Sequence, residues 1–228
     1  MQDSRVLTPG RVRGKVSLGY APPGAGDGHV MLEAGIRVGV VPRVELQAKL
    51  SDFGSQSAAL KVAIRDRASP FRISLLTGVQ RAEVLLDMHG EAWAATRLVF
   101  GINVTPVFGF RLSEAVELVV APDLQGGFKR GHSNADDLPT DSVAPTVPGY
   151  TAAWLGVGAR AGVALHVGTH VTLIPECSLL VVTAGPDVRP GEYNDYDDRT
   201  RPDNAFTVGD VRGQCGLAIN MGSAYVDR

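Results

Sequence analysis

The segment from Val30 to Val40 reads VMLEAGIRVGV, and its residue types change with a period of two. The even positions are all apolar, and they are Val30, Leu32, Ala34, Ile36 and Val38. The odd positions include Glu33, Gly35, Arg37 and Gly39. Successive side chains of a β-strand point to opposite faces, so this alternation predicts a strand with one apolar face and one face of glycine and charge.

The same alternation recurs along the chain and predicts an all-β fold. We expect strands at about 11–20, 28–39, 43–51, 58–66, 71–79, 92–103, 107–121, 151–165, 169–183 and 211–221. Tight connections at 41–43, 68–70, 105–106 and 167–168 alternate with longer ones at 21–27, 52–57, 80–91, 122–150 and 184–210. Antiparallel neighbours joined in this way have all short turns at one end and all long loops at the other. The sequence therefore predicts a closed, antiparallel, up-and-down β-barrel of about ten strands.

The composition excludes several classes of protein. The chain has 228 residues, a formal net charge of −2, 44% hydrophobic and 20% charged residues. A near-neutral charge argues against nucleic-acid binding as the main role, and the apolar content argues against a disordered chain. No apolar run reaches the length of a membrane-spanning helix. The N-terminal stretch lacks the apolar core of a signal peptide, so for an exported protein we expect that peptide to have been removed.

With its strand pattern and loop polarity, nearly the whole chain resembles the small outer-membrane β-barrel proteins of Gram-negative bacteria. The resemblance rests on architecture and on no sequence motif. It implies a transmembrane barrel in the bacterial outer membrane, with apolar side chains turned toward lipid. The expected organisation is an N-terminal tail at 1–10 followed by a single barrel domain at 11–228.

A soluble, lipocalin-like barrel that binds an apolar ligand would show the same alternation with its faces reversed. Charges of both signs on the polar face favour the membrane barrel. Aromatic residues near the strand ends also favour it, namely Tyr20, Trp93, Tyr150 and Trp154 toward the long loops and Phe71, Phe108 and Phe110 toward the short turns. Three features point the other way. Glu114 falls on the apolar face, and Pro175 interrupts a strand and is expected to need a bulge. The outer-membrane family usually ends its last strand on an aromatic residue, whereas Tyr225 lies short of the C-terminus.

The polar face predicts a network of charges in the lumen. Its members are Arg13, Lys15, Glu33, Arg37, Glu45, Lys49, Lys61, Arg65, Arg72, Arg97, Arg111, Glu117, Arg160 and Glu176. Ten strands enclose little more space than eight, whose interior side chains just fill the lumen. The network is therefore expected to be a salt-bridged plug, with a narrow anion or solute channel as the alternative. The basic residues exceed the acidic ones, so loop carboxylates, water or anions are expected to complete the balance.

No motif for a catalytic, cofactor or metal site stands in the expected context, so we predict a non-enzymatic protein without a cofactor or metal. A rim enzyme using Asp87 and His89 is the alternative.

Cys177 and Cys215 come opposite or nearly opposite in the last two strands. They are expected either to form a disulfide or to remain two reduced thiols, and the sequence leaves both alternatives open. The acidic loop 184–210 is expected to be solvated rather than a calcium site.

The predicted function is a membrane anchor or scaffold in the lipid bilayer. Loops 122–150 and 184–210 would contact any protein partner, and no nucleic acid is expected.

Overall fold

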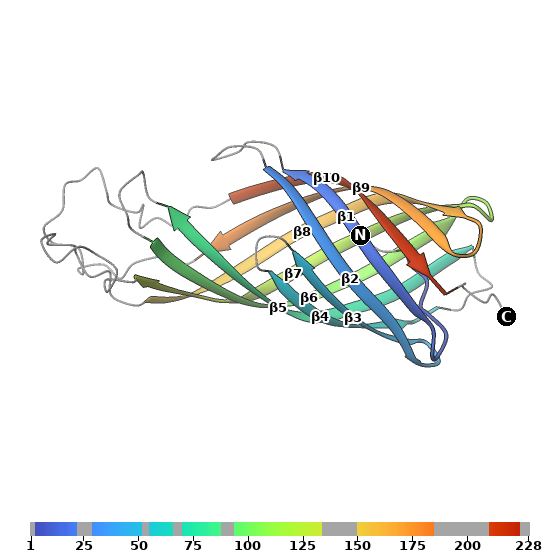
Figure 1. Cartoon of the computed structure of the whole chain (residues 1–228), viewed down its shortest axis with the longest axis horizontal. Coiled ribbons are helices and arrows are strands. Elements are labelled where there is room, and N and C mark those ends of the chain that lie inside the picture. The colour runs from blue at the N-terminus through green and yellow to red at the C-terminus, as the bar shows by residue number, and fades with distance from the viewer. Residues whose placement is uncertain are drawn as a thin grey trace, which may run out of the picture.

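The computed structural model describes residues 3–21, 29–51, 55–65, 70–87, 94–133, 150–184 and 210–223. These residues contain ten antiparallel strands that close into one barrel (Figure 1). The strands are β1 (Val12–Ala21), β2 (His29–Val41), β3 (Val44–Ser51), β4 (Gln56–Ala63), β5 (Phe71–Asp87), β6 (Ala94–Arg111), β7 (Val116–Ser133), β8 (Tyr150–Val167), β9 (Val171–Ala184) and β10 (Asp210–Gly222). In the described part of the chain, no helix is long and apolar enough to cross a membrane.

Each strand pairs with its neighbours in the chain, and β1 pairs with β10 to complete the ring. The predicted closed, antiparallel barrel of ten strands is therefore confirmed. The tight turns lie together at one end, on the right of Figure 1, and we call this the short-turn end. The opposite end, where the strands lead into the longer connections, is the long-loop end.

The strands from β5 to β7 are longer than predicted, and one turn was misplaced. Thr105 and Pro106, expected to form a turn, lie inside β6, and the turn to β7 is Leu112–Ala115. Proline usually marks a turn because it lacks an N–H group, but here Pro106 stands opposite Pro122, and the two share one gap in the ladder. Pairing resumes on either side, at Val104–Leu124 and Phe108–Val120, in an unchanged register.

The barrel is apolar outside and polar inside. Outward side chains such as Leu18, Leu32, Leu46 and Leu217 are exposed. Buried polar side chains are Asp3, Ser4, Arg13, Lys15, Arg37, Glu45, Gln47, Lys61, Arg72, Ser74, Thr105, Glu117, Asp123, Gln125, Thr172 and Asn220. Strands β6 to β10 also turn a buried apolar cluster inward, made of Val107, Val119, Ala121, Ala164, Ile174 and Ala218. Water-soluble proteins show the opposite distribution. Apolar side chains fill their interior, and their charged side chains are almost never fully buried without a partner.

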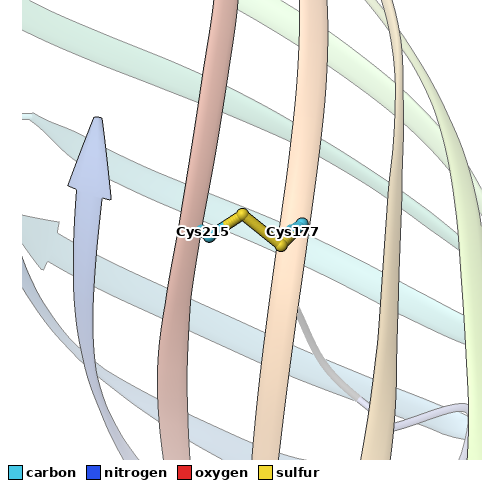
Figure 2. Close-up of a disulfide and its surroundings, with 2 residues drawn as sticks. All are labelled: Cys177 and Cys215. Atoms are coloured by element: carbon cyan, nitrogen blue, oxygen red, sulfur yellow. A yellow bond between two sulfur atoms is a disulfide. The ribbon is translucent and has the colours of Figure 1, made fainter. Parts of the chain in front are cut away.

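A disulfide joins two neighbouring strands on the outer face. Cys177 of β9 stands directly opposite Cys215 of β10, and their sulfur atoms are bonded (Figure 2). Pro175 lies close by, opposite Leu217, and the pairing of β8 with β9 is interrupted beside it. The register is the same on both sides of this interruption, so the bulge expected at Pro175 is absent. The lost hydrogen bonding is confined to one side of β9, while the disulfide fixes the other side to β10.

Loss of this disulfide is expected to lower the free energy of unfolding. The bond closes a loop across a sequence separation of 38 residues. A Cys177→Ala/Cys215→Ala variant should lose about 2–4 kcal/mol, because its unfolded chain regains the freedom of that loop. Urea midpoints of the variant and the parent in the same detergent measure the effect. Reducing agent should lower the parent's midpoint and leave the variant unchanged; equal midpoints throughout would contradict the prediction.

Candidate functional site

The N-terminal residues 3–10, which we call the strap, enter the lumen at the short-turn end. Asp3, Ser4, Val6 and Leu7 are all buried there. The strap joins β1 through Gly10, which has a φ of 76° and whose N–H donates to the carbonyl oxygen of Gly39 over 2.8 Å. Residues 3–8 of the expected N-terminal tail thus pack inside the barrel. The lumen and the strap together form the candidate site.

An ion pair between β2 and β3 holds one side of the strap. Arg37 Nε and Nη2 donate to the two carboxylate oxygens of Glu45 over 2.6 and 3.0 Å. Arg37 Nη1 also lies 3.3 Å from Asp3 Oδ1, and Nη2 donates to the carbonyl oxygen of Arg5 over 3.1 Å. Glu45 accepts hydrogen bonds from the Leu7 backbone N–H over 3.0 Å and from Gln47 Nε2 over 2.7 Å. One ion pair therefore binds both the side chains and the backbone of the strap.

Lys61 of β4 binds the strap through backbone oxygens. Its Nζ donates to the carbonyl oxygens of Asp3 and Arg5 over 2.5 and 2.8 Å. Lys61 is fully buried, so these carbonyls take the place of water around its ammonium group.

Glu117 of β7 binds the strap from the opposite wall. The backbone N–H of Ser4 donates to Glu117 Oε1 over 3.3 Å, and the Ser4 hydroxyl donates to the same oxygen. Glu117 Oε2 lies 3.8 Å from Arg5 Nε, 3.7 Å from Arg72 Nη1 and 3.7 Å from His166 Nε2. The strap therefore spans the lumen from β2 and β3 to β7.

Two inward-facing glycines leave room for the strap. A Cβ atom at Gly39 would overlap the carbonyl oxygen of Thr8 and come within 2.8 Å of that of Leu7. A Cβ atom at Gly109 would overlap the Ser4 hydroxyl and the Glu117 carboxylate. Absence of a side chain at these positions lets the strap backbone lie directly against the wall.

A second layer of polar contacts lies deeper in the lumen, toward the long-loop end. Glu33 accepts from Lys15 Nζ over 2.6 Å and from Lys49 Nζ over 2.9 Å. On the far wall, Asp123 Oδ2 accepts from Arg160 Nη2 over 2.7 Å. The same carboxylate accepts from Thr105 Oγ1 and Gln125 Nε2, each over 2.5 Å. Each carboxylate of this layer therefore meets at least one cation.

Arg13, Glu176 and Arg111 also belong to the predicted network. Arg13 is buried, and its Nη2 donates to the carbonyl oxygens of His170 and Asn220 over 2.9 and 3.2 Å. Glu176 is half-buried on the inner face of β9. Arg111 is at the β6–β7 turn, 3.8 Å from Glu114, which is in that turn and not on the apolar face.

Arg65 is not in the lumen. It is exposed beyond the end of β4, and its guanidinium carbon lies 5.5 Å from the centre of the Phe71 ring. The alternation was extended past the last residue of the strand, which led to this misplacement.

Some predicted residues lie outside the described part of the structure. The side chains of Arg97 and Asp87 are among them, as is the whole of His89. Most of the predicted loop 184–210 and residues 134–149 of the loop 122–150 are outside it as well, while 122–133 belong to β7.

The sequence analysis missed the strap and Asp123. Asp123 was placed in a loop, because β7 was expected to end at 121. The strap has one signal in its own residues, the apolar pair Val6–Leu7 followed by Pro9–Gly10, a dipeptide typical of turns. Nothing in that signal says that the turn leads into the barrel.

Taken together, the fold and the lumen define a closed barrel with an apolar exterior and a paired, polar interior. No group of His, Cys, Asp and Glu suited to a metal ion occurs among the residues that the structure describes. No protein-family model matches the chain, and no curated protein matches its sequence.

Two solved structures of small outer-membrane β-barrel proteins are similar to the chain. Neisserial surface protein A (NspA) has a TM-score of 0.40 and 12% identity, over 93% of this chain and 96% of that protein. Ail, the attachment invasion locus protein of Yersinia pestis, has a TM-score of 0.39 and 9% identity, over 95% of this chain and 100% of that one. Likenesses at this level say nothing about function.

Glu45→Gln is expected to destabilise the barrel by about 3–5 kcal/mol, because it removes the charged partner that accepts two hydrogen bonds from the buried Arg37 guanidinium. Glu114→Gln is the matched control. It removes a carboxylate that is 96% exposed and 3.8 Å from Arg111, so its effect should be about 0–1 kcal/mol. Urea unfolding followed by tryptophan fluorescence compares the two variants, and equal losses would show that the Glu45 ion pair adds nothing beyond an exposed one.

Proposed function

We propose that the chain is an integral β-barrel of the bacterial outer membrane. It serves as a non-enzymatic membrane anchor whose loops at the long-loop end form a recognition or assembly surface. The observation that carries this proposal is the inverted barrel: its outward side chains are apolar, while its charges are buried and paired inside.

The outer wall suits lipid. Exposed leucine, isoleucine, valine and phenylalanine side chains occur on all ten strands or at their ends. Soluble monomers rarely expose contiguous apolar patches of more than a few hundred Å², whereas a bilayer requires such a surface. In a closed barrel every strand has a neighbour on both sides, so no sheet edge with unpaired backbone groups meets hydrocarbon.

The lumen supports an anchor more than a lipocalin-like carrier. A carrier of apolar ligands needs an apolar interior, and the described interior presents charged and amide side chains along β2 to β5. The strap fills the short-turn end, which favours a closed resting barrel over an open channel. The interior carboxylates of Glu33, Glu45 and Asp123 each bind a cation, which leaves a structural role as their simplest use.

The partner surface is assigned by elimination of the other faces. The outer wall is used by lipid and the short-turn connections are only a few residues long, so little surface remains there. The longest connections, within the predicted loops 122–150 and 184–210, extend from the long-loop end. Loops of this length are usually functional or unstructured, and positioned loops on a rigid scaffold carry most recognition.

Charge on the outer wall is expected to separate a membrane barrel from a soluble one. Leu32 is 48% exposed on β2, and in lipid Leu32→Arg should cost about 2–4 kcal/mol near the bilayer midplane. Leu32→Ala is the matched control, since it shortens the side chain without adding charge. In a soluble barrel the same Arg would change stability by only about 0.5 kcal/mol.

The measurement is urea unfolding of the parent and both variants in lipid vesicles, followed by gel mobility with and without boiling. A membrane barrel should resist SDS until it is heated, because its strand edges are all paired. A monodisperse protein in plain buffer, with no heat-dependent shift and an unaffected arginine variant, would overturn the proposal.

A further inference from the structure

Solvent reaches the described side chains in the middle of the lumen more than those around the strap. The side chains of Lys49, Glu33 and Arg160 in the second layer are 24%, 28% and 35% exposed. At the level of the strap, Glu45 and Asp3 are 0% exposed and Arg37 is 2% exposed. Among the described residues, the second layer is therefore partly hydrated, while the level of the strap is nearly closed to solvent. The strap spans the lumen at that level from wall to wall.

The wall around the strap carries more positive than negative charge. Among the described residues at this level, the buried cations are Arg13, Arg37, Lys61 and Arg72, and the buried carboxylates are Glu45 and Glu117. The strap adds the Asp3 carboxylate, and its backbone carbonyls accept hydrogen bonds from Arg37 and Lys61. Arg5 of the strap lies against Glu117 and offsets Asp3 in net charge. A wall without the strap would thus keep an excess of cations that lack those carbonyl oxygens.

The strap can leave without opening the barrel. The ladder between β1 and its neighbours begins at Val12 and Arg13, so no strand pair includes a strap residue. The strap is linked to the barrel through Gly10, in the left-handed region that glycine adopts freely. The disulfide joins β9 to β10 and does not hold the strap. Its polar contacts are hydrogen bonds and ion pairs, which water and small anions can replace, and it also buries the apolar side chains of Val6 and Leu7.

We propose that the strap is a removable closure, and that its withdrawal turns the lumen into a narrow passage that favours small anions such as chloride. Arg37 and Lys61, which bind strap carbonyls in the closed state, bind the passing anions in the open one. This proposal rests on the membrane placement argued above. It goes beyond the anchor function by giving the barrel a second, conductive state.

Gly39→Ala is the sharpest test, because its added methyl group overlaps the Thr8 carbonyl oxygen and displaces the strap. Gly14→Ala is the matched control, since a Cβ atom there meets only the Met221 carbonyl oxygen at 3.9 Å. Both variants and the parent are inserted into planar bilayers in KCl. We expect the mean current of Gly39→Ala to exceed that of the parent about tenfold or more, because a steric cost similar to one or two hydrogen bonds shifts a two-state equilibrium by that factor. Gly14→Ala should match the parent. Under a KCl gradient the reversal potential should have the sign of chloride selectivity.

A deletion of residues 1–9 provides a second test in case the added methyl group is absorbed. This variant should conduct like Gly39→Ala. A synthetic peptide of sequence MQDSRVLTPG, added from the short-turn side, should block its current. The same peptide with Asp3→Asn should block less well, since it lacks the carboxylate that faces Arg37.

The heat-dependent gel shift of each variant reports separately whether the membrane barrel has folded. Folded variants that stay as silent as the parent, or that prefer potassium, would overturn the closure and leave the anchor function standing. If neither variant gives the shifted band while Gly14→Ala does, the strap is part of the folding core and the closure proposal fails. Current that the peptide does not reduce would also refute it.

Discussion

The ion pair between Arg37 and Glu45 is the interaction on which the lumen depends. A charge inside a narrow barrel loses its water, and the cost is offset only when a partner of opposite charge and further hydrogen bonds replace that water. Arg37 and Glu45 supply this to each other through two hydrogen bonds. The same two side chains also bind Asp3, Arg5 and Leu7, so the pair that neutralises the wall also holds the strap. Wall and strap are consequently one network. Loss of the Arg37 guanidinium or of the Glu45 carboxylate affects both the wall and the strap.

Closure of the sheet imposes a second constraint, because every strand needs a partner on each side. Pro106, Pro122 and Pro175 each lack a donor, and in an open sheet such residues are expected at edges or bulges. The barrel has no edge, and it keeps a single register across both interruptions. Pro106 and Pro122 share one gap, which limits the loss to one interface. Beside Pro175, the Cys177–Cys215 disulfide fixes the other side of β9, so the strand stays aligned where its ladder is weakest.

The period of two in the sequence was enough to predict the ten strands, their order and which residues share a face, because side-chain direction in a strand depends only on position. It was not enough for the turns. Pro106 suggested a chain reversal, and only the pairing of Pro106 with Pro122 across the sheet shows why β6 continues to Arg111. Asp123 was missing from the predicted lumen because β7 was expected to end at residue 121. Only a strand that continues past 121 brings Asp123 to the lumen. Arg65 shows the converse error, an alternation followed beyond Ala63 into a turn.

The strap could not be found by periodicity, because a segment bound along its backbone has no need of alternating side chains. Apart from the turn signal in its own residues, its trace in the sequence is indirect and lies in the charges of the wall. The predicted lumen contained more basic than acidic residues, and a buried excess of this kind requires acceptors from elsewhere. The structure places Asp3 and the carbonyls of residues 3 and 5 in that role. Acceptors from a backbone segment differ from wall carboxylates in one respect: they can withdraw together, without breaking any strand pair. A barrel whose charge balance is completed in this way therefore carries its own means of changing what the lumen admits.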